Sequence, residues 1–78
     1  MEIEFYTTYI KLCQFLKLAN IIVNGGEGKI LIQEGLVKVN GSIEYARGKK
    51  LFDGDVIEYE NQKYVVVNKN VDKNTAIN

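Results

Sequence analysis

Residues 11–41 read KLCQFLKLANIIVNGGEGKILIQEGLVKVNG, and the pattern of this stretch decides the fold. Its first part repeats apolar residues at the i, i+3, i+4 and i+7 spacing of an amphipathic helix: Leu12, Phe15, Leu16 and Ala19. Asn20 can adopt the left-handed conformation that ends a helix, and the β-branched residues that follow lead into a turn. The stretch therefore predicts a first helix from about residue 12 that ends at Asn20.

A second helix is predicted between Asn24 and Gly35. The side chain of Asn24 can cap its first turn, and Glu27, three residues later, can accept a bond from the backbone amide of the cap. Gly35 followed by apolar Leu36 is typical of a left-handed C-terminal cap. Gly28 lies in the interior, where glycine costs about 1 kcal/mol relative to alanine. The helix must therefore either pack closely at Gly28 or fray there.

Short strands are predicted before and after the two helices. Val37 and Val39 precede Asn40-Gly41, the strongest short signal for a hairpin turn, and Ile43 and Tyr45 follow on the return. Residues 56–59 and 64–67 indicate a second hairpin around Asn61-Gln62, and Asp53-Gly54 marks a further turn. Residues 3–5 alternate as a short strand that we expect at an edge of the sheet. Two helices with these hairpins make an α+β fold.

Length and composition predict one small folded domain. The chain has 78 residues, of which 46% are hydrophobic and 26% charged, as in globular domains. We assign residues 1–69 to a single domain and residues 70–78, which are mostly polar, to a flexible tail. A chain of this length buries only roughly 60% of its unfolded surface, so we do not expect a deep catalytic cavity.

Cysteine and histidine usage narrows the chemistry further. Cys13 is the single cysteine and the chain has no histidine, so neither an internal disulfide, a zinc site nor a base-activated thiol can form. No apolar run approaches the roughly 18 residues that span a bilayer. These observations predict a cytoplasmic protein with no catalytic residues, metal, cofactor or membrane contact.

The formal net charge is zero, but the charges are unevenly distributed. Residues 11–50 carry seven basic and three acidic residues, a net charge of +4, whereas residues 1–10 and 51–78 each carry a net charge of −2. A basic middle on an otherwise acidic chain favours a polyanionic partner such as a nucleic-acid backbone.

Six short motifs occur in a characteristic order: KL at 11–12, FL at 15–16, LIQEG at 31–35, VKVNG at 37–41, RGKKL at 47–51 and DGDV at 53–56. In this order and spacing they resemble the small RNA-binding domain named after ribosomal protein S-four, in its stand-alone bacterial YaaA/YbcJ-like form. The resemblance covers about residues 3–67. It implies two short helices, arranged like a helix-turn-helix, packed on a small, mainly antiparallel sheet.

The resemblance also implies a function and a set of residues. It predicts a non-catalytic protein that binds structured RNA, ribosomal or ribosome-associated, with ribosomal particles as further partners and no small-molecule substrate. The RNA would lie across the helices and the following hairpin, on Lys11, Gln14, Lys17, Asn24, Gly25, Gly26, Lys29, Gln33, Lys38 and Asn40. A secondary basic patch comprises Arg47, Lys49 and Lys50.

Alternative explanations apply to several of these residues. Gly25 and Gly26 lie where a helix N-terminus could accept a phosphate, but glycines there could equally serve the turn. Asn40 precedes Gly41 in a turn that explains its presence without RNA. As a whole, the chain could instead be an adaptor that binds a protein through its helical face or its edge strand.

Overall fold

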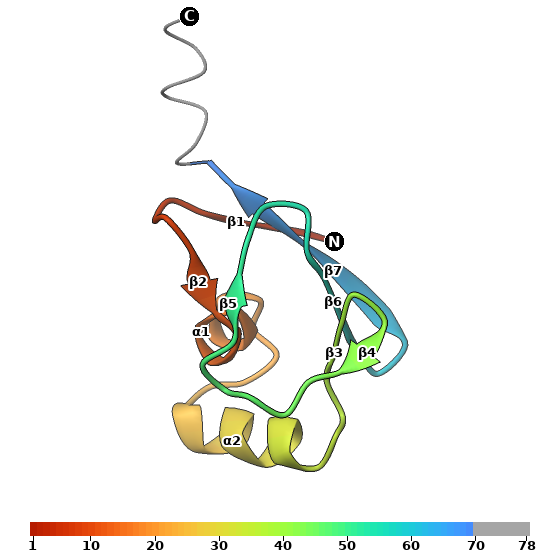
Figure 1. Cartoon of the computed structure of the whole chain (residues 1–78). Helices are drawn as coiled ribbons and strands as arrows, with labels where there is room; N and C mark the ends of the chain where they lie inside the picture. Colours follow the sequence, from red (N-terminus) through yellow and green to blue (C-terminus); the bar gives the residue numbers. More distant parts are fainter. Residues whose placement is uncertain (70–78) are drawn as a thin grey trace, which may run out of the picture.

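The computed structural model describes residues 1–69, so the predicted tail at residues 70–78 lies outside the described residues. Within residues 1–69, two helices and seven strands follow one another in the order β1 (Glu2–Phe5), β2 (Ile10–Lys11), α1 (Leu12–Leu18), α2 (Gly25–Gln33), β3 (Lys38–Val39), β4 (Ser42–Ile43), β5 (Lys50–Leu51), β6 (Val56–Tyr59) and β7 (Gln62–Asn68). Figure 1 shows α2 at the bottom of the domain and α1 above it, to the left of β6 and β7.

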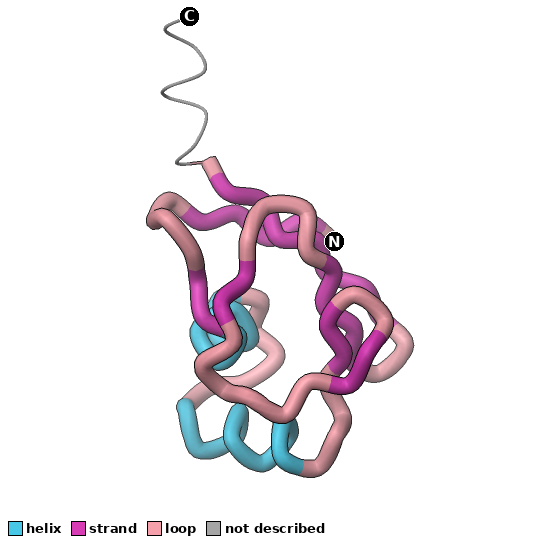
Figure 2. The backbone as a smooth tube through the Cα atoms, in the orientation of Figure 1, coloured by secondary structure: helices cyan, strands magenta, loops and turns pink. Residues whose placement is uncertain are grey.

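The strands form two sheets. The larger sheet has the order β1-β7-β6-β3-β4, in which β1 runs parallel to β7 and the other pairs are antiparallel. β2 and β5 form a separate antiparallel ladder beside α1 (Figure 2). The predicted α+β class, the mainly antiparallel sheet and the edge position of residues 3–5 are confirmed.

The first helix ends as its sequence predicts. Asn20 adopts a φ of 62°, its N–H donates to the Lys17 carbonyl at 3.0 Å, and the Ile21 N–H donates to the Leu16 carbonyl at 2.9 Å. This pair of bonds is a Schellman motif, which satisfies two of the carbonyls left open at a helix end. Leu12, Phe15 and Leu16 are fully buried and form the apolar stripe in the core.

The second helix is held at both ends by the predicted caps. The Glu27 N–H donates to Asn24 Oδ1 at 3.1 Å, and the Asn24 N–H donates to Glu27 Oε1 at 3.2 Å. At the far end Gly35 has a φ of 75°, and the Leu36 N–H donates to the Leu31 carbonyl at 3.1 Å. The capping box and the left-handed cap are therefore confirmed.

Gly28 is the point of close contact between the helices. It is buried, and a Cβ atom there would lie 2.8 Å from Ile22 Cδ1 and 2.9 Å from Cys13 Sγ. Such distances are shorter than any normal carbon or sulfur contact. Of the two alternatives for this glycine, close packing is the correct one.

The hairpins match the prediction with two differences. Asn40 and Gly41 have φ values of 51° and 88° and connect β3 to β4, but β4 ends at Ile43 and Tyr45 is exposed outside it. The second turn is centred on Glu60 and Asn61, one residue before the predicted position. This register places Lys63 opposite Glu58, a cross-strand pair of opposite charge that favours it.

Gly28→Ala is expected to lower the free energy of unfolding by about 1 kcal/mol, because the overpacking outweighs the better helix propensity of alanine. Gly25 lies in the same helix, and a Cβ atom there would have no neighbour within 4 Å, so Gly25→Ala should be neutral or stabilising. Urea denaturation of both variants measures the difference. In an Ile22→Val background, which removes the nearest atom, the cost of Gly28→Ala should shrink; an unchanged cost would contradict the packing explanation.

Candidate nucleic-acid interface

The β2–β5 ladder joins the beginning of α1 to the segment 47–50. Lys11 and Lys50 are register partners in the ladder. The Leu12 N–H donates to the Lys49 carbonyl at 2.8 Å, and the Cys13 N–H donates to the Arg47 carbonyl at 3.2 Å. The secondary basic patch therefore lies directly beside the first predicted RNA-binding residue. We call Lys11, Arg47, Lys49 and Lys50 together the basic cluster.

A shallow pocket of about 290 Å³ lies within the basic cluster. It is lined by Lys11, Cys13, Gln14, Arg47 and Gly48. Gln14 Oε1 accepts a hydrogen bond from the Lys11 backbone N–H at 3.2 Å, which orients the side chain and leaves its amide NH₂ as a donor. The pocket therefore combines two cations with an oriented amide, the groups that bind phosphates and sugar hydroxyls.

The cations of this region are not neutralised by neighbouring carboxylates. Among residues 1–69 the single ion pair joins Lys69 Nζ to Glu4 Oε2 at 4.0 Å, away from the basic cluster. Lys50 is partly engaged, since its Nζ lies 4.8 Å from the centre of the Tyr9 ring. The basic cluster thus keeps its positive charge available to an anionic ligand.

One flank of α2 adjoins the basic cluster. The Cys13 thiol lies 4.0 Å from the Gly25 carbonyl oxygen, so the wall of the pocket contacts the first turn of α2. Lys29 lies one turn beyond Gly25 on the same flank, and Gln33 lies a further turn along. Both side chains are exposed, and they extend the polar surface along α2.

The helix end at Asn24 is less open to an anion than the sequence suggests. The Glu27 carboxylate accepts hydrogen bonds from the Val23 N–H at 2.6 Å and the Asn24 N–H at 3.2 Å, so a negative charge already lies there. Gly25 and Gly26, however, are not among the residues with positive φ, and a Cβ at Gly25 would meet open space. The turn itself therefore does not require glycine at Gly25.

Lys38, Asn40 and Lys17 lie away from the basic cluster. Lys38 is in β3, directly opposite Glu58 of β6. Asn40 uses its side chain within the fold, since Nδ2 donates to Asp55 Oδ1 at 3.1 Å and Oδ1 accepts from the Val56 N–H at 2.9 Å. Lys17 lies in the last turn of α1, beside the segment that follows β1. The turn and its bonds explain Asn40 without any ligand.

Comparison with known proteins identifies the family. A family model described as the S4 domain matches residues 3–67 of this chain. The chain belongs to the S4 domain family. This confirms the resemblance drawn from the motifs, and with it a non-catalytic family of RNA-binding domains.

Two bacterial relatives resemble this S4 domain over most of their length. A Bacillus subtilis (strain 168) protein named "Probable ribosome maturation protein RlbA" is 48% identical over 54 residues, covering 69% of this chain and 76% of the relative. YbcJ of Escherichia coli (strain K12) is 34% identical over 59 residues, covering 76% and 84%. The solution structure of Escherichia coli YbcJ, described as revealing an "ALFAL" motif involved in RNA binding, superposes with a TM-score of 0.61 at 31% identity, covering 82% of this chain and 85% of that one.

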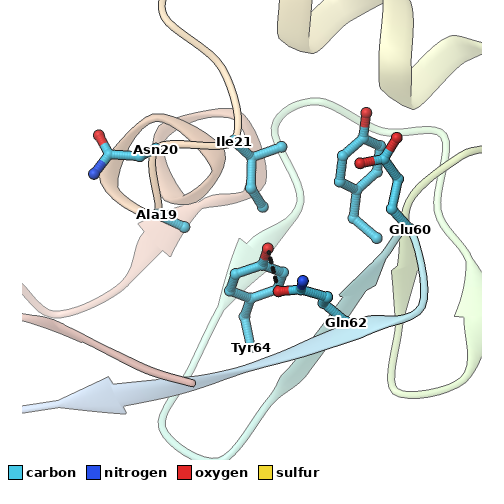
Figure 3. A pocket seen from close by; sticks show the side chains of 7 residues that line it. Ala19, Asn20, Ile21, Glu60, Gln62 and Tyr64 are labelled. Carbon is cyan, nitrogen blue, oxygen red and sulfur yellow. Dashed lines mark hydrogen bonds between the residues drawn. The ribbon is translucent and has the colours of Figure 1, made fainter.

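A second hollow, between the end of α1 and the β6–β7 hairpin, has a different character. This hollow of about 280 Å³ separates the end of α1 from the β6–β7 hairpin, and Figure 3 shows Ile21 on one side of it and Glu60, Gln62 and Tyr64 on the other. Tyr59 lines this hollow too, and its partial burial, followed by the nearby Glu60 carboxylate, raises the pKa of its hydroxyl above the usual value. With a carboxylate and no cation in its lining, this hollow does not suit a phosphate.

Two residues that line the pocket of the basic cluster are absent from the sequence-based prediction. Cys13 has no predicted role, and neither has Gly48, although it lies between Arg47 and Lys49. The RGKKL motif could have indicated Gly48 as a site residue, because a glycine between cationic residues allows the backbone of a loop to approach a ligand closely. Nothing in the linear pattern indicates that Cys13 would line the same pocket.

The described part of the chain shows neither a metal site formed by side chains nor a membrane-spanning helix. Residues 1–69 contain no group of three histidine, cysteine or acidic side chains arranged to hold a metal ion. Over the same residues, no helix is both long and apolar enough to cross a membrane.

Asn40→Ala is expected to lower the free energy of unfolding by about 1–2 kcal/mol, because it removes two hydrogen bonds and leaves alanine at a positive φ. Thermal unfolding followed by circular dichroism measures the loss. Asn40→Gly relieves the backbone strain but not the lost bonds, so it should recover part of the stability. If both variants were as stable as the wild-type protein, the structural role of Asn40 would be wrong.

Proposed function

We propose that this S4 domain binds structured RNA of the ribosome, without catalysis, through a surface that includes the basic cluster and the adjoining flank of α2. The observation that carries the proposal is the pair of backbone bonds from Leu12 and Cys13 to the segment 47–50, which unites two basic segments distant in sequence. A ribosomal target is supported by the Bacillus subtilis relative, whose name refers to ribosome maturation. Such a target corresponds to a cytoplasmic location and to ribosomal particles as partners.

The mechanism is electrostatic docking combined with recognition of RNA shape. Lys11, Lys29 and Lys49 contact phosphates as point charges, while the planar guanidinium of Arg47 can bind a phosphate through two parallel hydrogen bonds. Gln14 donates its amide to a sugar hydroxyl or phosphate oxygen, and Gln33 does the same from α2. These groups suit folded RNA, which is recognised through its backbone and 2′-hydroxyls more than through base edges.

The remaining predicted residues contribute at the edges of this surface. Lys17 extends it along α1, and Gly25 and Gly26 allow a phosphate to approach the backbone at the beginning of α2. Asn24 orients that turn. Lys38 and Asn40 would contact only an RNA that reaches across to the β3–β4 hairpin, and Glu58 beside Lys38 reduces its expected contribution.

Lys11→Ala and Arg47→Ala are each expected to weaken binding of ribosomal RNA fragments and to make the slope of log K against log salt shallower by about 0.7–0.9 per lost contact. Fluorescence anisotropy over a series of salt concentrations measures both quantities. Lys63→Ala is the matched control, since Lys63 is an exposed lysine opposite Glu58 on the β6–β7 hairpin. Equal behaviour of the three variants and the wild-type protein would rule out the proposed surface.

Gly25→Ala tests the contribution of the helix end separately. The variant is expected to keep its stability but to lose RNA affinity severalfold, because the methyl group hinders a phosphate that approaches the backbone. The same anisotropy titration measures it, with unfolding monitored in parallel. Unchanged affinity would show that the beginning of α2 does not contact RNA and would leave the basic cluster unaffected.

The alternative function, an adaptor that binds a protein, is supported by a different surface of the domain. Val23 and Ile30 are 87% and 57% exposed, and Ile30 lines a depression with Ile21 and Tyr59. Exposed apolar side chains around a depression are typical of protein docking surfaces. Salt dependence separates the two functions, because a protein partner bound through apolar contacts would show little of the counterion release expected for RNA.

A further inference from the structure

A second depression, of about 470 Å³, lies between α1 and the segment that follows β1. The buried side chains of Phe5 and Ile10 form its apolar floor. Tyr6 and Leu18 also line it and are 68% and 46% exposed. Its volume is within the roughly 300–1,000 Å³ of ligand pockets, and it is shallow and widely open, as a site for part of a larger molecule must be.

Tyr6 is not needed by the fold. It follows the last residue of β1, its ring lies outside the core, and its hydroxyl makes a long bond of 3.3 Å to the exposed carboxylate of Glu4. A single exposed aromatic residue is common on a protein surface. Here, however, the ring stands beside an apolar floor and a second exposed apolar side chain, Leu18, which gives a flat ligand a surface to cover.

Gln14 connects this depression to the basic cluster. Its side chain lines both the pocket with Lys11 and Arg47 and the depression with Tyr6. Because Gln14 Oε1 is held by the Lys11 backbone N–H, its NH₂ group is the end available to a ligand in either space. Lys17 supplies a cation at the rim of the depression. An aromatic face, an amide donor and a cation therefore adjoin one another.

We propose that this depression binds one unpaired nucleobase of the RNA, stacked on Tyr6 and packed against Leu18, with the NH₂ of Gln14 donating to the base edge and Lys17 contacting the adjacent phosphate. The inference rests on the proposed RNA-binding function and adds a preference for RNA with an unpaired nucleotide beside a helix. A base within a duplex cannot enter the depression, because the adjacent bases of the helix cover both faces of that base. An unpaired base offers a free face for stacking.

The test uses an RNA hairpin with a five-nucleotide loop, taken from the ribosomal fragment that binds most tightly, and a series in which each loop nucleotide in turn is made abasic. With the wild-type protein, one abasic position should weaken binding about tenfold, the effect of losing one stacked base. Tyr6→Ala should weaken binding of the intact hairpin by a similar factor and should make the protein insensitive to that abasic position. This non-additivity is the signature of direct contact.

Two controls separate this site from the basic surface. Tyr6→Phe retains the ring and should bind within about twofold of the wild-type protein, because stacking needs the aromatic face and not the hydroxyl. The salt slope should stay unchanged in Tyr6→Ala and become shallower in Lys11→Ala. Since Tyr6 is exposed and outside β1, the Tyr6 variants should fold normally, and their unfolding curves check this.

The outcomes are distinguishable from a failure of the proposed function. If Tyr6→Ala binds the intact hairpin like the wild-type protein while Lys11→Ala binds it more weakly, the base site is wrong and the RNA-binding surface stands. If the effects of Tyr6→Ala and of the abasic nucleotide simply add, Tyr6 does not contact that base and the inference is overturned. If the hairpin does not bind at all, both the inference and the proposed function fail.

Discussion

The contact on which the rest of this structure depends is the backbone pairing between the beginning of α1 and the segment 47–50. A helix leaves its first N–H groups without acceptors, and Lys11, at the N-cap position, has no side-chain oxygen to offer. The carbonyls of Arg47 and Lys49 fill that role for Cys13 and Leu12. The segment thereby completes the helix, and the helix fixes the position of the segment.

This pairing has an electrostatic consequence. The acceptors for α1 come from the most basic segment of the chain, so cations gather at a helix N-terminus, the positive end of its dipole. No ion pair relieves them within the described residues. Like charges held together in this way repel, and a polyanion lowers that repulsion when it binds. A protein with no net charge can therefore carry a surface suited to RNA.

Close packing at Gly28 orients the second helix relative to this surface. Ile22 and Cys13 occupy the space that a side chain at Gly28 would need, so α2 approaches α1 closely at that turn. The Cys13 thiol thereby lies 4.0 Å from the Gly25 carbonyl oxygen, and Ile30 lines a separate depression with Ile21 and Tyr59. The first turn of α2 therefore contacts the wall of the pocket within the basic cluster, and Ile30 in its middle lines a mostly apolar depression.

The sequence by itself determined the elements whose causes are local. The Asn24–Glu27 capping box, the left-handed residues Asn20 and Gly35 and the Asn40-Gly41 turn each depend on side chains within a few residues, and all are present. Only the tertiary structure decided that Lys11 and Arg47 line one pocket and that Gln14 and Tyr6 line one depression. The same holds for the hydrogen bond from the Asn40 side chain to Asp55. These contacts join residues that are distant in the chain, and they arise from backbone pairing and core packing. The sequence pattern around each residue does not show which distant residue it will meet.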